Sequence, residues 1–136
     1  MSELQRKIEE LQTIIDEGRR IVFFTGAGVS TDSGIPDFRS ANGLYNQDLG
    51  REVSPEEMIS HSFYMRHTKD FYEFYKDKLI YKDAKPNACH KALAELEKQG
   101  KVRAIVTQNI DGLHQLAGSK TVFELHGSVL RNYCEN

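Results

Sequence analysis

A short apolar run that ends in a glycine-rich turn restricts the fold of this 136-residue chain more than any other feature. Ile21-Val22-Phe23-Phe24 leads, through one threonine, into Gly26-Ala27-Gly28-Val29-Ser30. The run is too short for a helix, and its β-branched and aromatic residues favour a strand covered on both faces, as in a parallel sheet. Glycines after such a strand let backbone N–H groups approach a pyrophosphate. The run therefore predicts a parallel sheet with a possible ligand site at its edge.

Helix and strand patterns alternate along the rest of the chain, which predicts an α/β fold. Apolar residues at three- and four-residue steps predict a helix over residues 3–17, and two further short strands are expected at 102–107 and 121–125. The other expected elements are a loop over 34–53, a helix starting at Ser54-Pro55, and helices at 63–81, between Asn87 and Gly100, and at 112–116. The first two strands are about 75 residues apart, too far for one crossover helix, so we expect an inserted helical module.

Charge and cysteine content exclude several classes of protein. Lys and Arg number 18 against 20 for Asp and Glu, and the net charge of −2 argues against a nucleic-acid partner. No apolar run approaches the roughly 20 residues that span a bilayer, and the first residues lack the apolar region of a signal peptide, so no membrane partner is expected. The two cysteines, Cys89 and Cys134, cannot build a disulfide framework, which favours a cytoplasmic location. Cys89 falls on an expected helix and is predicted to be a buried packing residue.

The glycine turn departs from the ordinary dinucleotide-binding fingerprint. Thr31 stands at the place of its third glycine, and the next glycine is Gly34. No acidic residue ends a second strand about 20 residues later. An ordinary dehydrogenase is therefore disfavoured. On this segment alone, a sharp strand-to-helix turn that binds nothing stays an alternative.

A second segment, Gly34 to Ser40, places Phe38 beside Arg39. A flat apolar ring next to a guanidinium group suits a phosphate clamp with a shielded reaction centre. The alternative is an exposed turn whose Phe38 ring fills the core. The residues of this segment alone favour neither reading.

Polar residues also follow the second and third expected strands. Gln108, Asn109 and Asp111 come at the end of the second strand, and open parallel sheets bind ligands at the carboxyl ends of their strands. Asn109 or Asp111 could instead cap the short helix that follows, on which His114 is more consistent with packing than with catalysis. His126 follows the third strand, where a histidine could act as a general base, although a lone histidine is more often structural.

Taken together, these segments resemble, in order and spacing, the signature stretches of the sirtuin family of NAD-dependent protein deacylases. Ala84-Lys85-Pro86-Asn87, followed by His90 and Leu93, also resembles the family's A-x-P…H-x-x-L helix. The resemblance implies that residues 1–136 are the N-terminal part of a sirtuin catalytic domain. Its implied parts are a Rossmann-like parallel sheet from residues 20–44 and 101–136, and an inserted helical module at about 45–100.

The resemblance implies NAD as cofactor and an acyl-lysine protein or peptide as substrate, with the acyl group transferred to ADP-ribose and nicotinamide released. His126 would be the base that activates a ribose hydroxyl, and Asn109 would act beside the nicotinamide ribose. Phe38 would shield the reaction centre, Arg39 would reach phosphate or ribose, and Asp111 would hold the carboxamide. The implied NAD-binding residues are Gly26, Ala27, Gly28, Ser30, Thr31, Asp37, Phe38, Arg39, Gln108, Asn109, Ile110, Asp111 and His126.

The family's zinc module uses four thiolates in two C-x-x-C pairs, and Cys134 resembles its first ligand. We therefore expect the start of a zinc-binding module here, with one structural zinc ion in the full-length protein. The chain given is expected to be truncated and inactive alone. Two other functions stay open: an NAD glycohydrolase or ADP-ribosyltransferase, and a non-catalytic NAD-binding fragment. The oligomeric state cannot be inferred from the sequence.

The expected acyl group is neutral. Sirtuins that remove acidic acyl groups carry a Tyr-x-x-Arg pair on the helical module, and its counterpart here is Tyr72-Glu73-Phe74-Tyr75, without the arginine. The resemblance therefore implies a preference for acetyl-lysine over succinyl-lysine, because a buried carboxylate without a cationic partner is costly.

Overall fold

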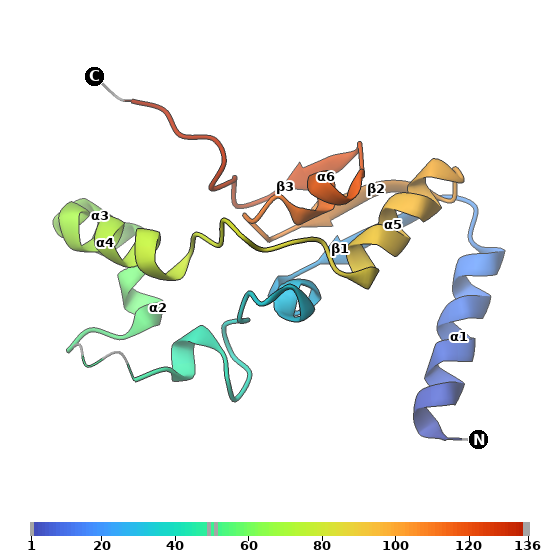
Figure 1. Cartoon of the computed structure of the whole chain (residues 1–136), viewed down its shortest axis with the longest axis horizontal. Coiled ribbons are helices and arrows are strands. Elements are labelled where there is room, and N and C mark those ends of the chain that lie inside the picture. Colours follow the sequence, from blue (N-terminus) through green and yellow to red (C-terminus); the bar gives the residue numbers. More distant parts are fainter. Residues whose placement is uncertain (1, 49, 51, 135–136) are drawn as a thin grey trace.

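The computed structural model describes residues 2–48, 50 and 52–134. Helices and strands alternate within it, with a helical group between the first two strands (Figure 1). The elements are α1 (Glu3–Glu17), β1 (Ile21–Thr25), η1 (Ala27–Ser33), η2 (Leu44–Asn46), α2 (Pro55–Met58), α3 (His61–Arg66), α4 (Thr68–Lys78), α5 (Ala88–Lys98), β2 (Val102–Thr107), α6 (Leu113–Ala117) and β3 (Val122–Glu124).

The three strands form one parallel sheet in the order β1-β2-β3, which confirms the predicted α/β class. Thr25 at the end of β1 pairs with Thr107 at the end of β2, and Thr107 pairs with Glu124 at the end of β3. All three strands therefore end at the same edge. The segments that follow β1, β2 and β3 leave the sheet at this edge. They carry the polar residues that were selected as candidates from the sequence.

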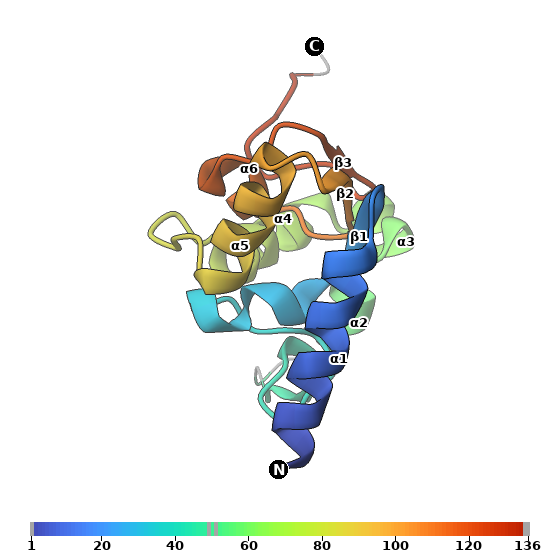
Figure 2. The ribbon, with the colours of Figure 1, turned by 90° about the vertical axis from the view of Figure 1, so that its right-hand side faces the viewer.

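One face of the sheet carries a core and the other does not. Leu93 of α5, Val102 and Ile105 form a buried cluster, and Figures 1 and 2 show α5 and α6 side by side along this face. On the opposite face Val22 and Phe24 are 57% and 64% exposed. The expectation of a strand covered on both faces is therefore wrong for β1 in the described structure, because α5 packs on one face only.

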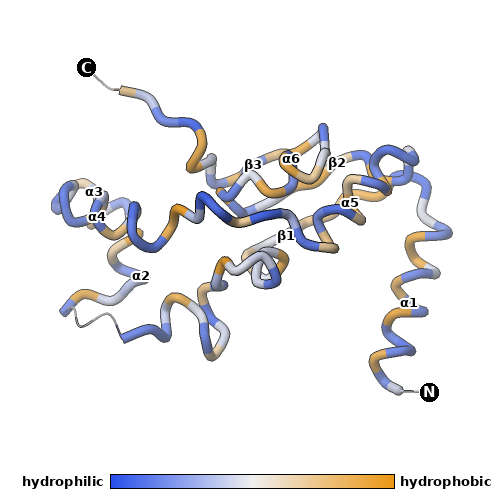
Figure 3. Tube along the Cα trace, viewed as in Figure 1, coloured by the Kyte–Doolittle hydropathy of each residue, from blue (hydrophilic) through white to orange (hydrophobic). Residues whose placement is uncertain are grey.

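The predicted helix over residues 3–17 is confirmed as α1, whose first turn is capped by the Ser2 hydroxyl accepting from the Gln5 N–H. Its apolar and polar residues alternate around the axis, and the helix lies at the far end of the molecule from α3 and α4 (Figure 3). None of its residues is buried. The ammonium group of Lys101 holds its last turn by donating to the carbonyl oxygen of Ile15 at 3.1 Å.

The helical group between β1 and β2 has a core of its own, formed by Leu44, Met58, Phe63 and Phe74. The single helix expected over residues 63–81 is instead two helices, α3 and α4. The chain breaks at His67, whose φ of −135° and ψ of 51° are not helical. The break redirects α4, and this brings Phe63 and Phe74 into the same core.

Two smaller findings concern the rest of the chain. Cys89 is exposed on α5, so its expected role as a buried packing residue is wrong. No helix in the described ranges is long and apolar enough to cross a membrane.

Candidate functional site

A cavity of about 660 Å³ lies between the carboxyl edge of the sheet and the helical group. Chain segments from both sides of the molecule form its walls. Its lining residues are Ala27, Ser30, Ile35, Pro36, Asp37, Phe38, Arg39, Leu44, Tyr45, Ile59, Phe71, Tyr75, Lys78, Leu79, Tyr81, Gln108, Asn109, Ile110, Asp111 and His126.

Most of the predicted site residues line this one cavity, although they come from four separate segments of the chain. Gly26, Gly28 and Thr31 do not line it. A Cβ atom at Gly28 would meet no atom within 4 Å, so the turn has open space beside it. The Thr31 hydroxyl is used locally, because it donates to the Gly28 carbonyl oxygen at 2.9 Å.

The Phe38 and Arg39 wall is braced by its own loop. The Phe38 ring lies 5.2 Å from the Tyr45 ring, and the Arg39 guanidinium lies 5.6 Å from the same ring centre. Gly43 makes this close turn possible, since a Cβ there would lie 2.7 Å from the Asp37 carboxylate and the Phe38 backbone. Asp37 also accepts from the Ser40 N–H at 3.0 Å, so its carboxylate stabilises the loop.

A network of buried polar side chains lies behind the opposite wall. The Ser30 hydroxyl donates to the Asp111 carboxylate at 2.7 Å and accepts from the Asn109 side-chain amide at 3.2 Å. The other Asp111 oxygen accepts from the Leu113 N–H at 2.9 Å at the start of α6. The N-cap residue of α6 is Gly112, so neither Asn109 nor Asp111 takes that position, but the Asp111 carboxylate accepts from the first N–H of the helix and also lines the cavity.

Two histidines lie beneath this network. His90 and His114 are fully buried, with ring centres 4.9 Å apart, and the Nε2 atom of His114 lies 3.0 Å from the Thr25 hydroxyl. Burial lowers the pKa of both imidazoles, with a smaller opposing effect from the nearby Asp111 carboxylate. Both rings are therefore neutral near pH 7, and His114 is a packing residue.

The buried imidazoles predict acid-sensitive stability. Unfolding returns each pKa toward 6.5, so below pH 6.5 the unfolded chain binds more protons than the folded chain. We expect the free energy of unfolding to be constant above this pH and to fall below it, by up to about 1.4 kcal/mol per pH unit for each imidazole. Urea unfolding of the chain and of His114→Gln between pH 8 and 5 tests this. An equally steep decline in the variant would contradict the assignment to His114.

His126 lies at the cavity in the turn that follows β3. Its side chain is exposed, so the imidazole can exchange protons with solvent. The next residue, Gly127, has a φ of +78°, a conformation that side-chain-bearing residues rarely adopt. After this turn the Val129 N–H donates to the Ile110 carbonyl oxygen at 3.0 Å, so the chain passes beside the segment that carries Asp111.

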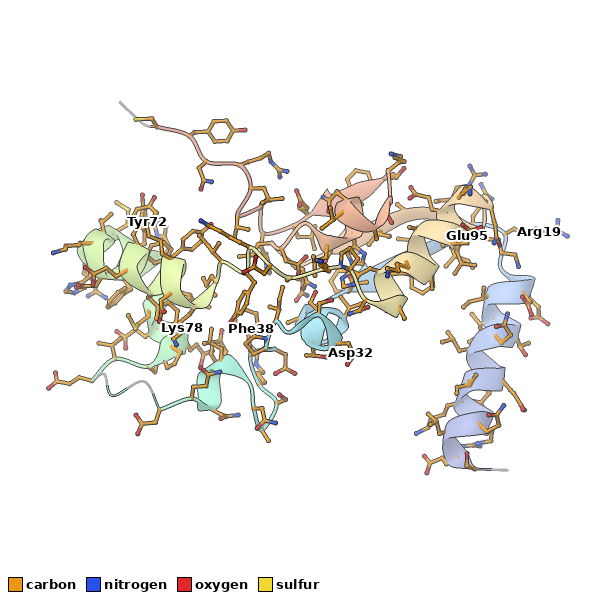
Figure 4. All side chains as sticks on the ribbon, in the orientation of Figure 1. Arg19, Asp32, Phe38, Tyr72, Lys78 and Glu95 are labelled. Atoms are coloured by element: carbon orange, nitrogen blue, oxygen red, sulfur yellow. The ribbon has the colours of Figure 1, made fainter. Side chains whose placement is uncertain are left out.

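From the helical group, sequence reasoning placed only the segment Tyr72 to Tyr75 near the acyl group, and it missed Phe71 and Lys78. Phe71, Tyr75 and Lys78 of α4 line the cavity, whereas Tyr72 is not among its lining residues. Figure 4 shows Lys78 on the side of α4 nearer to Phe38, and Tyr72 on the other side. Burial raises the pKa of the Tyr75 phenol, as it does for Tyr81. The helical spacing of Phe71 and Tyr75 was a signal that these residues share a face, but not that the face meets a ligand site.

The comparison with known families agrees with this arrangement. The family model of the Sir2 family matches residues 26–136, which is more than half of the chain. The chain belongs to the Sir2 family. NAD-dependent protein deacetylases of Clostridium perfringens and Bacillus anthracis are 66% and 47% identical to it, over 94% and 95% of its length. This Sir2-family chain spans about half the length of the curated relatives it matches, 52% in both cases.

Solved structures of Sir2 enzymes share the fold of this Sir2-family chain. One, from a study of the mechanism and regulation of Sir2 enzymes, is 45% identical with a TM-score of 0.79, over 91% of this chain and 47% of its own. Another, of Sir2 with a p53 peptide and NAD+, is 44% identical with a TM-score of 0.74, over 94% of this chain and 49% of its own.

The cavity of the Sir2-family chain has the chemical groups that a dinucleotide would need. Arg39 is a cation that an anionic group could pair with, and Asn109 and Asp111 are an amide and a carboxylate that can bond to polar groups. A zinc site is not formed by the described residues, among which no three or more His, Cys, Asp or Glu side chains gather as a metal site would require. Cys134 is exposed and free.

Proposed function

We propose that this chain is the NAD-binding and catalytic part of an NAD-dependent protein lysine deacetylase. The observation that carries the proposal is the single cavity in which Arg39, Phe38, Asn109, Asp111 and His126 meet. The names of its relatives and the solved Sir2 complexes with NAD+ and a p53 peptide support it. An acetyl group would leave a lysine side chain for ADP-ribose, and nicotinamide would be released.

The cavity residues have complementary tasks in this proposal. Bound NAD would supply a ribose carbon from which nicotinamide departs. Arg39 would bind phosphate or ribose, while Gln108 and Asn109 would bind the nicotinamide ribose. Asp111 has one lone pair left on each carboxylate oxygen after its contacts with Ser30 and Leu113, so it can still accept from a carboxamide.

Phe38 and His126 would act on the reaction itself. The Phe38 ring, braced against Tyr45, would exclude water and returning nicotinamide from the reacting carbon. His126 would accept the proton of a ribose hydroxyl at its imidazole ring and pass it to solvent, to which its side chain is exposed. Ala27, Ser30 and the neighbouring turn residues would line the phosphate side.

Two measurements on one preparation of a protein of the relatives' full length test the proposal. Calorimetric titration with NAD is expected to give saturable binding, and an acetyl-lysine peptide is expected to be deacetylated only when NAD is present. Nicotinamide release without acyl-lysine would favour an NAD glycohydrolase or an ADP-ribosyltransferase instead. NAD binding without any turnover, in a protein of the relatives' full length, would favour a non-catalytic NAD-binding module.

The proposed substrate is acetyl-lysine rather than succinyl-lysine. Tyr75 lines the cavity at the place where acid-specific sirtuins are expected to have an arginine, and the nearby Lys78 already lies 3.2 Å from the Asp77 carboxylate. In a protein of the relatives' full length, we expect succinyl-lysine turnover about a thousandfold below acetyl-lysine turnover on one peptide sequence. The matched variant is Lys78→Met, which removes the nearby cation that could pair with a succinyl carboxylate. A strong loss of succinyl-lysine turnover in this variant, or equal turnover of both peptides in the unchanged protein, would contradict a neutral acyl pocket.

We propose that Cys134 is one ligand of a structural zinc ion in a full-length family member. A polypeptide of residues 1–136 has two cysteines, of which Cys89 lies on α5, and a single thiolate holds zinc weakly. We therefore expect this polypeptide to contain no stoichiometric zinc by elemental analysis and to have no measurable deacetylase activity. One zinc ion per chain together with robust turnover would overturn this expectation.

The remaining parts of the proposal concern context. A cytoplasmic location fits two cysteines that are both free, and the net charge of −2 favours a protein substrate over nucleic acid. The boundaries of the sheet at 20–44 and 101–136, and of the helical module at about 45–100, stay predictions. Limited proteolysis tests them, because cleavage is expected in exposed loops at the boundaries.

A further inference from the structure

The histidine of the Asn87–His90 segment has no role in the chemistry described so far, yet it is fully buried directly behind the cavity. Asn87 caps α5, and its backbone N–H donates to the Nδ1 atom of His90 at 3.3 Å. A backbone N–H can only donate, so Nδ1 must present a lone pair. In the neutral ring the proton is then on Nε2.

The proton on Nε2 of His90 determines which hydrogen bonds the Ser30 hydroxyl accepts and which one it donates. The Nε2 atom of His90 lies 3.5 Å from the Ser30 hydroxyl oxygen, the longest contact of the network, and as an N–H group it can only donate. The Asn109 side-chain amide donates to the same oxygen at 3.2 Å. With both lone pairs occupied, the Ser30 hydroxyl proton points to Asp111, to which it donates at 2.7 Å. All hydrogen-bonding groups of Ser30 are used.

We propose that His90 is a positioning residue that, as its Nε2–H tautomer, orients Ser30 and through it the Asn109 amide and the Asp111 carboxylate at the cavity wall. The Asn109 amide group then has its nitrogen toward Ser30 and its oxygen free for a ligand. The Asp111 carboxylate is held by one hydrogen bond on each oxygen, from the Ser30 hydroxyl and from the Leu113 N–H. The link to NAD rests on the proposed function, whereas the tautomer and the two orientations do not.

The groups that surround the ring are consistent with this tautomer. His114 of α6 faces the ring at 4.9 Å between centres, and Asp111 is the nearby carboxylate that acts on it. Asn87 is tied to the neighbouring turn, because its side-chain amide donates to the Val29 carbonyl oxygen at 2.7 Å. The cap of α5 and η1 are thereby joined at the point where His90 meets Ser30.

The first experiment reads the tautomer directly. Two-bond ¹H–¹⁵N correlation spectra of the unchanged chain distinguish the protonated ring nitrogen of each histidine, and we expect Nε2 to be protonated and Nδ1 to be unprotonated in His90. A protonated Nδ1 would overturn the proposal, whether or not NAD binds. This measurement needs no variant and therefore does not depend on a variant folding.

The second experiment asks whether His90 acts through Ser30. His90→Leu removes the donor, whereas His90→Gln can place an amide N–H near the position of Nε2. We expect the Asn109 side-chain amide protons to exchange about tenfold faster in His90→Leu, and most of this protection to return in His90→Gln. Ser30→Ala should match His90→Leu, and the exposed His61→Gln is the control. Unchanged exchange in both His90→Leu and Ser30→Ala would overturn the proposal.

The same variants separate the proposal from the proposed function. If Asn109 loses protection in His90→Leu and NAD affinity falls about tenfold with partial return in His90→Gln, both are supported. If protection changes as expected but the unchanged chain binds no NAD, the positioning role stands and the proposed function of this polypeptide fails. If NAD binds equally well to all variants, His90 does not position a ligand-binding group.

Discussion

Replacing His126 by alanine is expected to lower kcat/KM for an acetyl-lysine peptide by about a hundred- to ten-thousandfold, in a protein of the relatives' full length. The imidazole lies at the cavity edge and is exposed, so it is placed to carry a proton between a ribose hydroxyl and solvent. It acts after NAD is bound, so NAD affinity measured by calorimetry is expected to stay within a few-fold.

The control for this prediction is His67→Ala, which removes an exposed imidazole between α3 and α4, away from the cavity lining. This variant should retain its turnover. If NAD affinity collapses together with turnover in His126→Ala, His126 is a binding or structural residue rather than a base. A turnover that persists within tenfold would also contradict the assignment.

The second large effect is expected on stability. Phe74 is 1% exposed at the centre of the helical core, in contact with the elements that carry Leu44, Met58 and Phe63. Phe74→Ala leaves a cavity that the surrounding side chains fill only in part, and such changes lower the free energy of unfolding by about 3–5 kcal/mol. α4 also supplies Phe71 and Tyr75 to the cavity. We therefore expect the cavity wall formed by α4 to loosen in the same variant.

Urea unfolding monitored by circular dichroism measures the first effect, and binding of an acyl-lysine peptide measures the second. The matched control is Met65→Ala on α3, because Met65 is 63% exposed and its truncation should cost no more than about 0.5 kcal/mol. Equal destabilisation by the two substitutions would show that Phe74 is not the centre of this core.

The sequence predicted the strands and most of the helices well, because their signals are local. The apolar run at Ile21 and the periodic stripe over residues 3–17 depend only on near neighbours, and both elements were found where expected. The break at His67 was not predicted, since the apolar pattern continues through it. The helix ends there because packing of Phe63 and Phe74 into one core requires two axes rather than one.

The candidate site, like the fold, could be predicted only where its signals are local. Residue types and their spacing were enough to select Phe38, Arg39, Asn109, Asp111 and His126 as candidates. Their individual roles came from the resemblance of these segments to the signature stretches of the sirtuin family. On the α4 wall, Tyr75 was selected only through the family resemblance, and Lys78 had no such signal. A helix shows in its sequence which residues share a face, but not which surface that face will meet.

By itself, then, the sequence determined the α/β class and the Sir2-type motifs, since each follows from local pattern. Only the tertiary structure decided that β1 is covered on one face and that α4 closes the cavity. It also decided that a buried imidazole at His90 stands behind Ser30, which lies 60 residues away along the chain. Contacts of this kind depend on how separate elements pack, and packing is a property of the whole set of side chains rather than of any one segment.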